Sequence, residues 1–183
     1  MKRLNQLKGI KKQGGWISIE MNMSNLVYGV LSIAAISLGV AMLSNASSNA
    51  LTSGHRQIVD NVRDNYKNTS TTTGLNNTVG VSLKVAPPPW MSGTASIVNN
   101  LNGAVTIATA TISVTGDAFT VAEAGLNGDQ CRDFVNDIFP EAYTITVGST
   151  TVKAAGATVS NPATIGTACG SATNTVTPRY TRQ

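Results

Sequence analysis

Residues 14–43 read GGWISIEMNMSNLVYGVLSIAAISLGVAML, and this stretch carries the strongest structural signal in the chain. Its part from residue 26 to residue 43 is apolar and uncharged, and a run of about 18 such residues lies near the lower limit for a helix that spans a membrane. One acidic residue, Glu20, precedes this run. A carboxylate is costly in lipid and needs a partner. The stretch therefore predicts a membrane helix whose one carboxylate requires a positive charge.

The residues before this stretch are basic. Five of the 13 Lys and Arg lie in residues 1–15, whereas all 9 Asp and Glu lie after Gly15. The rest of the chain thus carries 8 basic and 9 acidic residues. Basic residues stay on the cytoplasmic side of a membrane, so the net charge of +4 indicates a topology with a cytoplasmic N-terminus. It does not indicate binding to nucleic acid.

Three ways of processing this N-terminus are open. A signal peptide would be cut after the apolar run, where Ala46-Ser47-Ser48 offers small residues, but this leaves the Gly14-Gly15 pair and Glu20 unexplained. Cleavage after Gly15 makes Trp16 the first residue and Glu20 the fifth, and it retains the apolar helix. In a polymer, Glu20 then pairs with the amino terminus of a neighbouring copy, which partly offsets the desolvation of both charges. The third possibility is a simple membrane anchor with Glu20 at the interface.

The helical pattern continues to about residue 67, without proline from Trp16 onward. A helix of about 50 residues is roughly 75 Å long. Its second half should pack on a globular head through a stripe of Ala46, Ala50, Leu51, Ile58, Val62 and Tyr66. His55 is expected on the solvated face of this helix. The composition changes at Asn68 to turn-forming residues, so we expect three regions: 1–15, 16–67 and 68–183.

The region 68–183 reads as a β-rich head with one helix. We expect strands over residues 104–114, 119–121, 143–147 and 150–153, and near Val159 and Val176. A helix capped by Asn127 or Asp129 should run to Ile138. Trp90 follows three prolines and is expected to cover the junction of helix and sheet, with an exposed contact as the alternative. The fold class is therefore α+β.

The two cysteines, Cys131 and Cys169, both lie in the part expected to be exported. In an oxidising compartment they should form a disulfide, and two separate buried thiols are the alternative.

No arrangement typical of an enzyme is found. The cysteines have neither CxxC nor zinc spacing, the one histidine stands alone, and nucleotide-binding and hydrolase motifs are missing. Asp129, Asp133 and Asp137 share a helix face, which could bind a cation but is better explained as a solvated acidic surface. We therefore expect no catalytic residue, no metal and no cofactor.

Several segments resemble type IVb pilins. The leader of about 15 residues and a first mature residue, Trp16, that is not Phe are similar to the N-terminus of that class. Residues 100–107 (NLNGAVTI) resemble the Asn-x-(Gly)-Gly-x-Val-Thr-Val segment of its major pilins, with Asn102 where the family tends to have Gly. Residues 118–121, then Gly125-Leu126 and Cys131, resemble a strand followed by a helix that carries a cysteine, and Cys169 takes the place of the second cysteine. The chain is most similar to PilS-like pilins, although Asn22, Ser24 and Asn25 stand where the family is more apolar.

This resemblance implies a type IV pilin fold: a long N-terminal helix packed on an antiparallel sheet, with a disulfide-closed C-terminal region. It implies that a prepilin peptidase cuts between Gly15 and Trp16 and N-methylates Trp16. An assembly ATPase and an inner-membrane platform protein would then move the subunit from the inner membrane into an extracellular homopolymer, with Glu20 setting the register. Such a thin fibre would serve conjugation, adhesion or aggregation. The alternatives are a minor pilin or secretion pseudopilin, and a membrane-anchored or secreted monomeric binding module.

Overall fold

The computed structural model describes residues 46–182. Residues 46–66 form a helix, called here the N-terminal helix. The elements that follow are α2 (Asn77–Ser82), a 3-10 turn η1 (Pro88–Trp90), β1 (Met91–Ser92), β2 (Ser96–Ile97), β3 (Val105–Thr111), β4 (Thr115–Leu126), α3 (Gly128–Ile138), β5 (Thr144–Val147), β6 (Thr150–Lys153), α4 (Pro162–Ala168) and β7 (Asn174–Thr181). The α+β class is therefore confirmed for the described residues.

The main sheet has five antiparallel strands in the order β3-β4-β7-β5-β6. The last strand of the chain, β7, therefore lies between β4 and β5 and joins the two hairpins. Its residues alternate between buried and more exposed positions along the whole strand, as expected when one face of a sheet is covered. A separate small sheet pairs β1 with β2.

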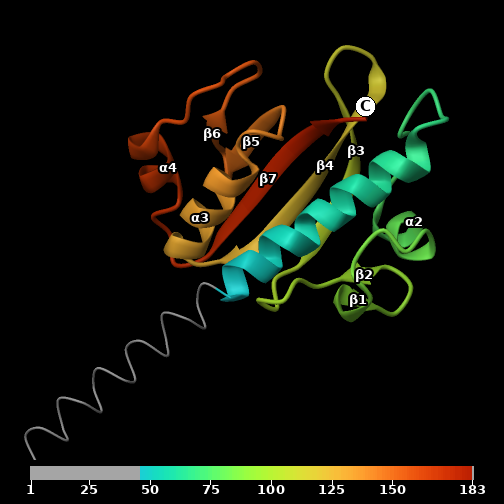
Figure 1. The fold of residues 1–183 in the computed structure, drawn as a ribbon, viewed down its shortest axis with the longest axis horizontal. Coiled ribbons are helices and arrows are strands. Elements are labelled where there is room, and N and C mark those ends of the chain that lie inside the picture. Colours follow the sequence, from blue (N-terminus) through green and yellow to red (C-terminus); the bar gives the residue numbers. More distant parts are fainter. Residues whose placement is uncertain (1–45, 183) are drawn as a thin grey trace, which may run out of the picture. The chain divides into compact units, whose positions relative to one another are not determined.

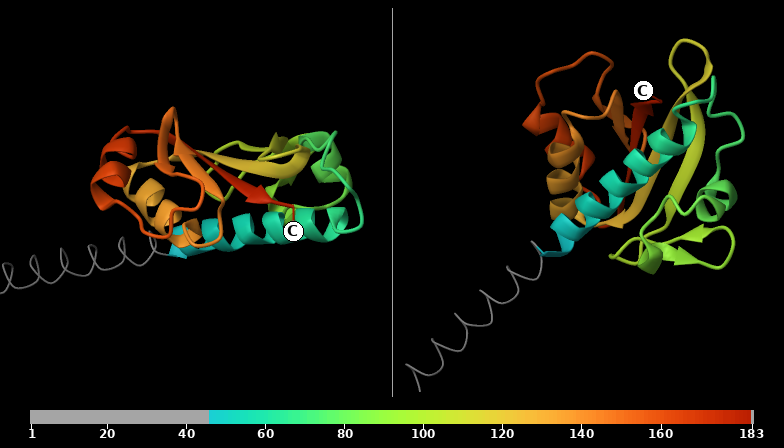
Figure 2. Two further views of the ribbon diagram at one scale, coloured as in Figure 1. Left: turned by 90° about the horizontal axis from the view of Figure 1, so that it is seen from above. Right: turned by 45° about the vertical axis from the view of Figure 1, so that its right-hand side comes forward.

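The N-terminal helix and α3 cover the same face of this sheet. Figure 1 shows the N-terminal helix crossing the strands beside α3, and Figure 2 shows both helices on one side of the sheet. The ring of His55 on the N-terminal helix lies 4.9 Å from the ring of Phe134 on α3, measured between centroids. The core therefore lies between these two helices and the sheet, and it includes the buried Leu51, Ile58, Phe119, Ile145 and Tyr180.

Most of the expected strands form, with different lengths. The strand expected over residues 104–114 is β3, the hairpin of β5 and β6 turns at Gly148 with a φ of 55°, and a strand contains Val176. The short strand expected over residues 119–121 is instead the longest strand, β4. The strand expected near Val159 is wrong: this side chain is 82% exposed, and the chain continues into α4.

The buried stripe of the N-terminal helix differs from the expected one. Leu51, Ile58 and Val62 are buried as expected, and Tyr66 packs partly against them. Ala46 and Ala50 are exposed, so the prediction that these two residues belong to the buried stripe is wrong. His55 was expected in solvent but is fully buried, because the partners described below satisfy both of its ring nitrogens.

Candidate functional site

The junction between the N-terminal helix and the sheet contains a buried polar network. His55 Nδ1 lies 3.0 Å from Glu123 Oε1, and His55 Nε2 lies 2.8 Å from the Tyr180 hydroxyl. Asn99 Nδ2 donates to Glu123 Oε2 at 3.0 Å. His55, Glu123 and Tyr180 are all 0% exposed. The network therefore links the helix, β4, β7 and the loop after β2 inside the core.

The hydrogen-bond directions follow from the chemistry of these groups. Burial, together with the nearby carboxylate of Glu141, raises the pKa of the Tyr180 hydroxyl, so this group keeps its proton. With Glu123 ionised and the imidazole neutral, Nδ1 donates to the carboxylate and Nε2 accepts from the Tyr180 hydroxyl. Each buried polar atom then has a partner, which is what a stable core requires. Because no member reaches solvent, the network holds the helix and does not form a catalytic site.

A close contact between Gly54 and Trp90 fixes the same helix from another direction. A Cβ atom added to Gly54 would lie 2.4 Å from Cζ2 of Trp90, so only glycine leaves room for the indole. Trp90 is 7% exposed, which confirms that it covers the junction. The glycine that weakens the isolated helix is thus the residue that lets the helix approach the head.

Polar side chains connect the N-terminal helix to α3 at the surface. Thr52 Oγ1 donates to Asp137 Oδ2 at 3.0 Å. Arg56 Nε donates to Glu141 at 2.8 Å, and its Nη2 donates to the backbone oxygen of Asp137 at 3.0 Å. Such exposed pairs contribute little, about 0–1 kcal/mol each. They add to an attachment whose main part is the buried contact.

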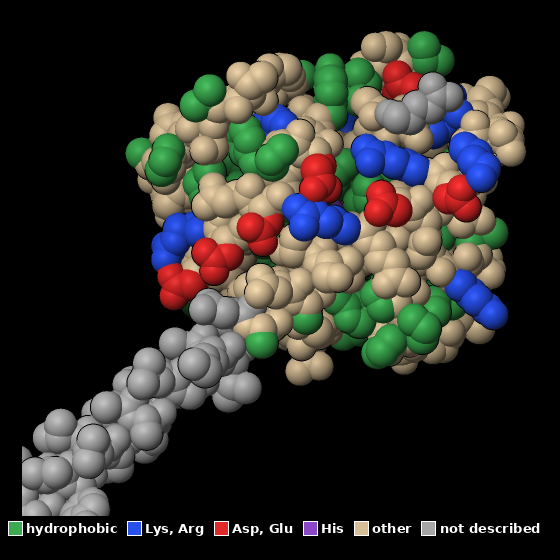
Figure 3. All heavy atoms as spheres, viewed as in Figure 1, with side chains coloured by type: hydrophobic (Ala, Val, Ile, Leu, Met, Phe, Trp, Pro, Cys, Tyr) green, Lys and Arg blue, Asp and Glu red, His purple; other side chains and the backbone are tan. Residues whose placement is uncertain are grey.

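The acidic row on α3 is solvated, as expected. Asp129, Asp133 and Asp137 are all exposed, and Asp129 pairs with Arg132. Figure 3 shows acidic side chains in a row over α3 on this face. Within residues 46–182, no group of three or more His, Cys, Asp or Glu side chains is arranged to hold a metal ion.

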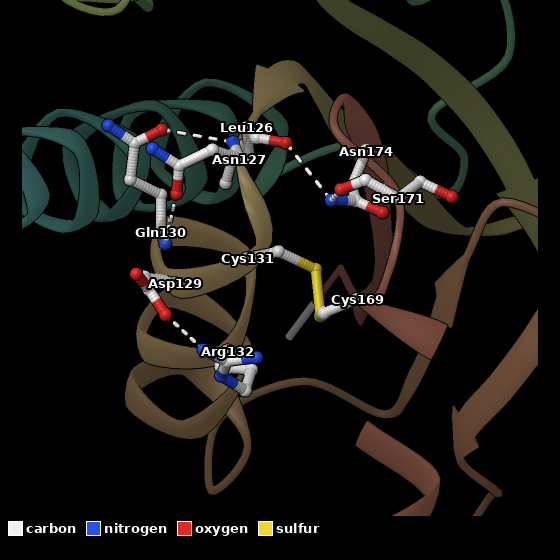
Figure 4. Close-up of a disulfide and its surroundings, with 9 residues drawn as sticks. All are labelled: Leu126, Asn127, Asp129, Gln130, Cys131, Arg132, Cys169, Ser171 and Asn174. Atoms are coloured by element: carbon white, nitrogen blue, oxygen red, sulfur yellow. Dashed lines mark hydrogen bonds and ion pairs between the residues drawn. A yellow bond between two sulfur atoms is a disulfide. The ribbon is translucent and has the colours of Figure 1, made fainter. Parts of the chain in front are cut away.

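The predicted disulfide between Cys131 and Cys169 is present. Their Cα atoms are 5.7 Å apart, and the bond joins α3 to the residue that ends α4 (Figure 4). At the start of α3, Asn127 and Gln130 form a reciprocal capping box. Asn174 Nδ2 donates to the backbone oxygens of Leu126 and Ser171, at 3.1 and 2.9 Å, and thereby ties the start of β7 to the same place. The bond and these caps close the C-terminal region into one unit.

Gly15, Trp16 and Glu20, the residues expected to carry processing and assembly, lie outside the described residues. Between residues 46 and 182, no helix is both long and apolar enough to cross a membrane.

The buried network is the feature that sequence reasoning missed. In β4, every second side chain points to the same face, which places Phe119, Val121 and Glu123 together. This two-residue alternation was enough to predict a buried carboxylate at Glu123. No comparable signal marks His55, because its partners Glu123 and Tyr180 lie 68 and 125 residues away.

Comparisons with known proteins gave one family-model match and matches to solved structures. The family model described as "PilS N terminal" matches residues 44–179. The crystal structure of a type IVb pilin from Salmonella typhi is similar with a TM-score of 0.57 and 15% identity, and the match covers 73% of this chain and 99% of that one. TcpA, a type IV pilin from the Vibrio cholerae El Tor biotype, is similar with a TM-score of 0.55 and 16% identity, over 74% of this chain and 99% of that one.

A search of curated protein sequences gave no match. The likeness to the two crystal structures, at such low identity, shows a shared fold. The family is shown by the match over most of the chain, and the family and fold are structural and not enzymatic. The chain therefore belongs to the PilS family, and its described part has the fold of the type IVb pilin structures.

Proposed function

We propose that this chain is the structural subunit of a type IVb pilus, which polymerises through its N-terminal helix into a thin extracellular fibre that serves cell contact. In this proposal, residues 1–15 are a leader that is removed, and residues 16–67 form a helix that anchors the subunit in the inner membrane before assembly and lies in the filament core afterwards. Residues 68–183 form the exposed head. Membership of the PilS family and the pilin fold of the head support this assignment.

The observation that carries the proposal is the order of features along the chain. Gly15-Trp16, Glu20 and the apolar run stand directly before the part that matches the family model. A prepilin peptidase would cut after Gly15 and methylate Trp16. An assembly ATPase and a platform protein would then extrude the subunit. Retaining the apolar helix gives each subunit a surface to bury against copies of itself.

The experiment that tests the proposal is the intact mass and N-terminal sequence of the protein sheared from cells. We expect a start at Trp16, one additional methyl group and two fewer hydrogens for the disulfide. A start near Ser47 or Ser48, or an uncut Met1 in the membrane fraction, would contradict it and indicate a secreted or anchored binding module. If fibres in the sheared fraction contain this chain only in traces, it is a minor pilin or a pseudopilin.

Assembly should depend on the charge of Glu20. Glu20→Val should leave cleavage after Gly15 largely intact and strongly reduce fibres, because the amino terminus of the neighbouring copy loses its counter-charge. Electron microscopy and the amount of sheared subunit measure the effect. Glu20→Asp is the matched control, since it keeps the charge and should retain more assembly. Normal fibres from Glu20→Val would remove the register role of this residue.

A further inference from the structure

A hollow lies at the end of the sheet where β7 finishes and β6 leaves for α4. It has a volume of about 490 Å³ and is lined by the loop of residues 139–143, by Lys153, by residues 156–158 and by Thr181. Sites for small molecules have volumes of about 300–1,000 Å³ and combine apolar walls with a few polar groups. The hollow therefore has the size of a small-ligand site.

Lys153 is the buried basic residue in the wall of this hollow. Its side chain is buried, with the residue 6% exposed. Nζ donates to the backbone oxygens of Phe139 and of Ala142, the latter at 2.6 Å, and it lies 4.7 Å from the centroid of the Phe139 ring. Both oxygens lie just beyond the end of α3, where a cation is favourable. Two of the three donors of the ammonium group are thus in use.

The charge of Lys153 has no carboxylate partner among residues 46–182. The contacts between carboxylates and basic side chains there join His55 to Glu123, Arg56 to Glu141, Lys67 to Asp64 and Arg132 to Asp129. Burial lowers the pKa of the Lys153 ammonium, because the charged form has lost water without gaining an anion. Glu141, which also lines the hollow, is already engaged by Arg56 at 2.8 Å. A buried cation with a third donor left over favours an anionic ligand.

The rest of the wall indicates the shape of that ligand. Tyr143 is half-buried, and Pro140, Ala142 and Ala157 provide apolar surface. An aromatic side chain of this kind offers a flat apolar face with a polar end. Neither the Tyr143 hydroxyl nor the exposed Thr158 hydroxyl makes a hydrogen bond within residues 46–182. A ring with an apolar C–H face to pack on Tyr143, hydroxyl groups at its edge and one carboxylate matches these surfaces, and an acidic sugar combines these features.

We propose that this hollow binds an acidic monosaccharide, whose carboxylate accepts a hydrogen bond from Lys153 Nζ and whose ring packs on Tyr143. The ligand carboxylate supplies the missing anion, and the hydroxyl groups of the sugar meet those of Tyr143 and Thr158. This site is separate from the residues that the filament proposal needs, so either proposal can fail without the other.

The test is an NMR titration of the full chain, unassembled in detergent micelles, with glucuronate and with glucose. These two probes differ at the carboxylate. We expect saturable shifts of the amides of residues 139–143 and 153–158 with glucuronate, and glucose should bind roughly tenfold more weakly, the loss expected for one charge-assisted hydrogen bond. The pKa of Lys153 should also rise when glucuronate binds, because an anion favours the ammonium. Equal binding of the two sugars, or no binding of glucuronate, would overturn the proposal.

Three variants complete the test. Lys153→Met should abolish the preference for glucuronate. Because Lys153 also caps α3, this variant can lose stability, and Tyr143→Ala serves as a second variant that removes only the partly exposed wall; it should weaken glucuronate binding severalfold. Lys67→Met is the matched control, since Lys67 is an exposed lysine that directly follows the N-terminal helix and pairs with Asp64, and this variant should bind like the parent chain. An equal loss with Lys67→Met would show non-specific attraction and contradict the proposal.

Discussion

At the scale of single residues, Gly54 shows how tertiary packing reverses a local preference. Glycine inside a helix costs about 0.5–1 kcal/mol relative to alanine, so local propensity favours its replacement. The Trp90 indole occupies the space that a Cβ would need. Gly54 therefore weakens the helix locally, but it allows the helix to make close contact with the head.

This conflict makes Gly54→Ala a sharp test. We expect a loss of about 1–3 kcal/mol, as for other overpacked cores, measured by urea unfolding of the full chain in detergent. The matched control is Gly166→Ala in α4, where an added Cβ meets nothing within 4 Å, and which should be neutral or stabilising. If both substitutions stabilise the chain, the indole moves freely and the contact does not hold the helix.

At the scale of elements, one carboxylate organises the turn between β3 and β4. The side chain of Asp117 accepts hydrogen bonds from the backbone N–H groups of Ile112, Ser113 and Val114, at 2.7, 2.8 and 2.8 Å. These bonds, with that from Ile112 the strongest influence, lower the pKa of Asp117 below its usual 3.8. The ionised carboxylate is thus part of the structure of this hairpin.

The stability of the hairpin should therefore depend on pH in a defined direction. Since the folded pKa is lowered, the contribution of Asp117 is present above the unfolded pKa and is lost as the pH falls through the folded value. The unfolding midpoint of Asp117→Asn should lie below that of the parent at pH 7. The difference between the two midpoints should become smaller below about pH 4. The midpoint of Asp64→Asn, at an exposed position of the N-terminal helix, should differ little from that of the parent at either pH. If the difference in midpoint between Asp117→Asn and the parent is unchanged at low pH, this account is contradicted.

The disulfide acts on a second group of elements. It joins α3 to the end of α4 across 38 residues of sequence, so the chain-entropy model gives it about 4 kcal/mol of stabilisation. The double variant Cys131→Ser/Cys169→Ser should lose a comparable amount in urea unfolding. Adding a reductant to the unfolding parent chain should reproduce the loss. If the unfolding midpoint of the double variant equals that of the parent, the capping box and the Asn174 bonds alone hold the region closed.

At the scale of the whole molecule, the network of His55, Glu123, Tyr180 and Asn99 connects parts that are distant in the chain. It joins the N-terminal helix to β4 and β7, which lie side by side in the sheet. In the filament that we propose, this network would transmit force between the head and the helix, together with the Gly54–Trp90 contact and the Arg56–Glu141 pair. A buried, directional connection allows one position of the helix on the sheet, whereas apolar contacts alone are less specific.

The network can be tested by a pair of substitutions. His55→Leu should cost about 3–5 kcal/mol, because it leaves the carboxylate of Glu123 buried without its ring partner. Adding Glu123→Gln removes the uncompensated charge while an amide oxygen still accepts from Asn99, so the double variant should be more stable than His55→Leu alone. Urea unfolding of the parent, both single variants and the double variant measures the coupling. Additive losses would show that the two side chains do not interact.

Local signals in the chain were sufficient for much of the architecture. The capping residue Asn127 and the strand patterns over residues 143–147 and 150–153 each predicted an element that the structure contains. Helix α4 was not expected, although Asn161-Pro162 offers a cap followed by proline at the first helical position, where α4 begins. These features depend on residues that are close in sequence, where hydrogen bonding and backbone restriction act directly.

The position of each element in the molecule depends on contacts between distant residues. The burial of His55, the fit of Trp90 over Gly54 and the insertion of β7 between β4 and β5 all join segments far apart in the chain. The same holds for Lys153, whose place at the end of an expected strand gave no sign that it would bond the backbone just beyond α3, in the wall of a hollow. The sequence therefore predicted many of the elements and the pairing of the two cysteines, and its basic N-terminal residues remain the basis for the predicted leader. Which polar groups become buried is settled only when the chain packs, because their partners are supplied by other elements.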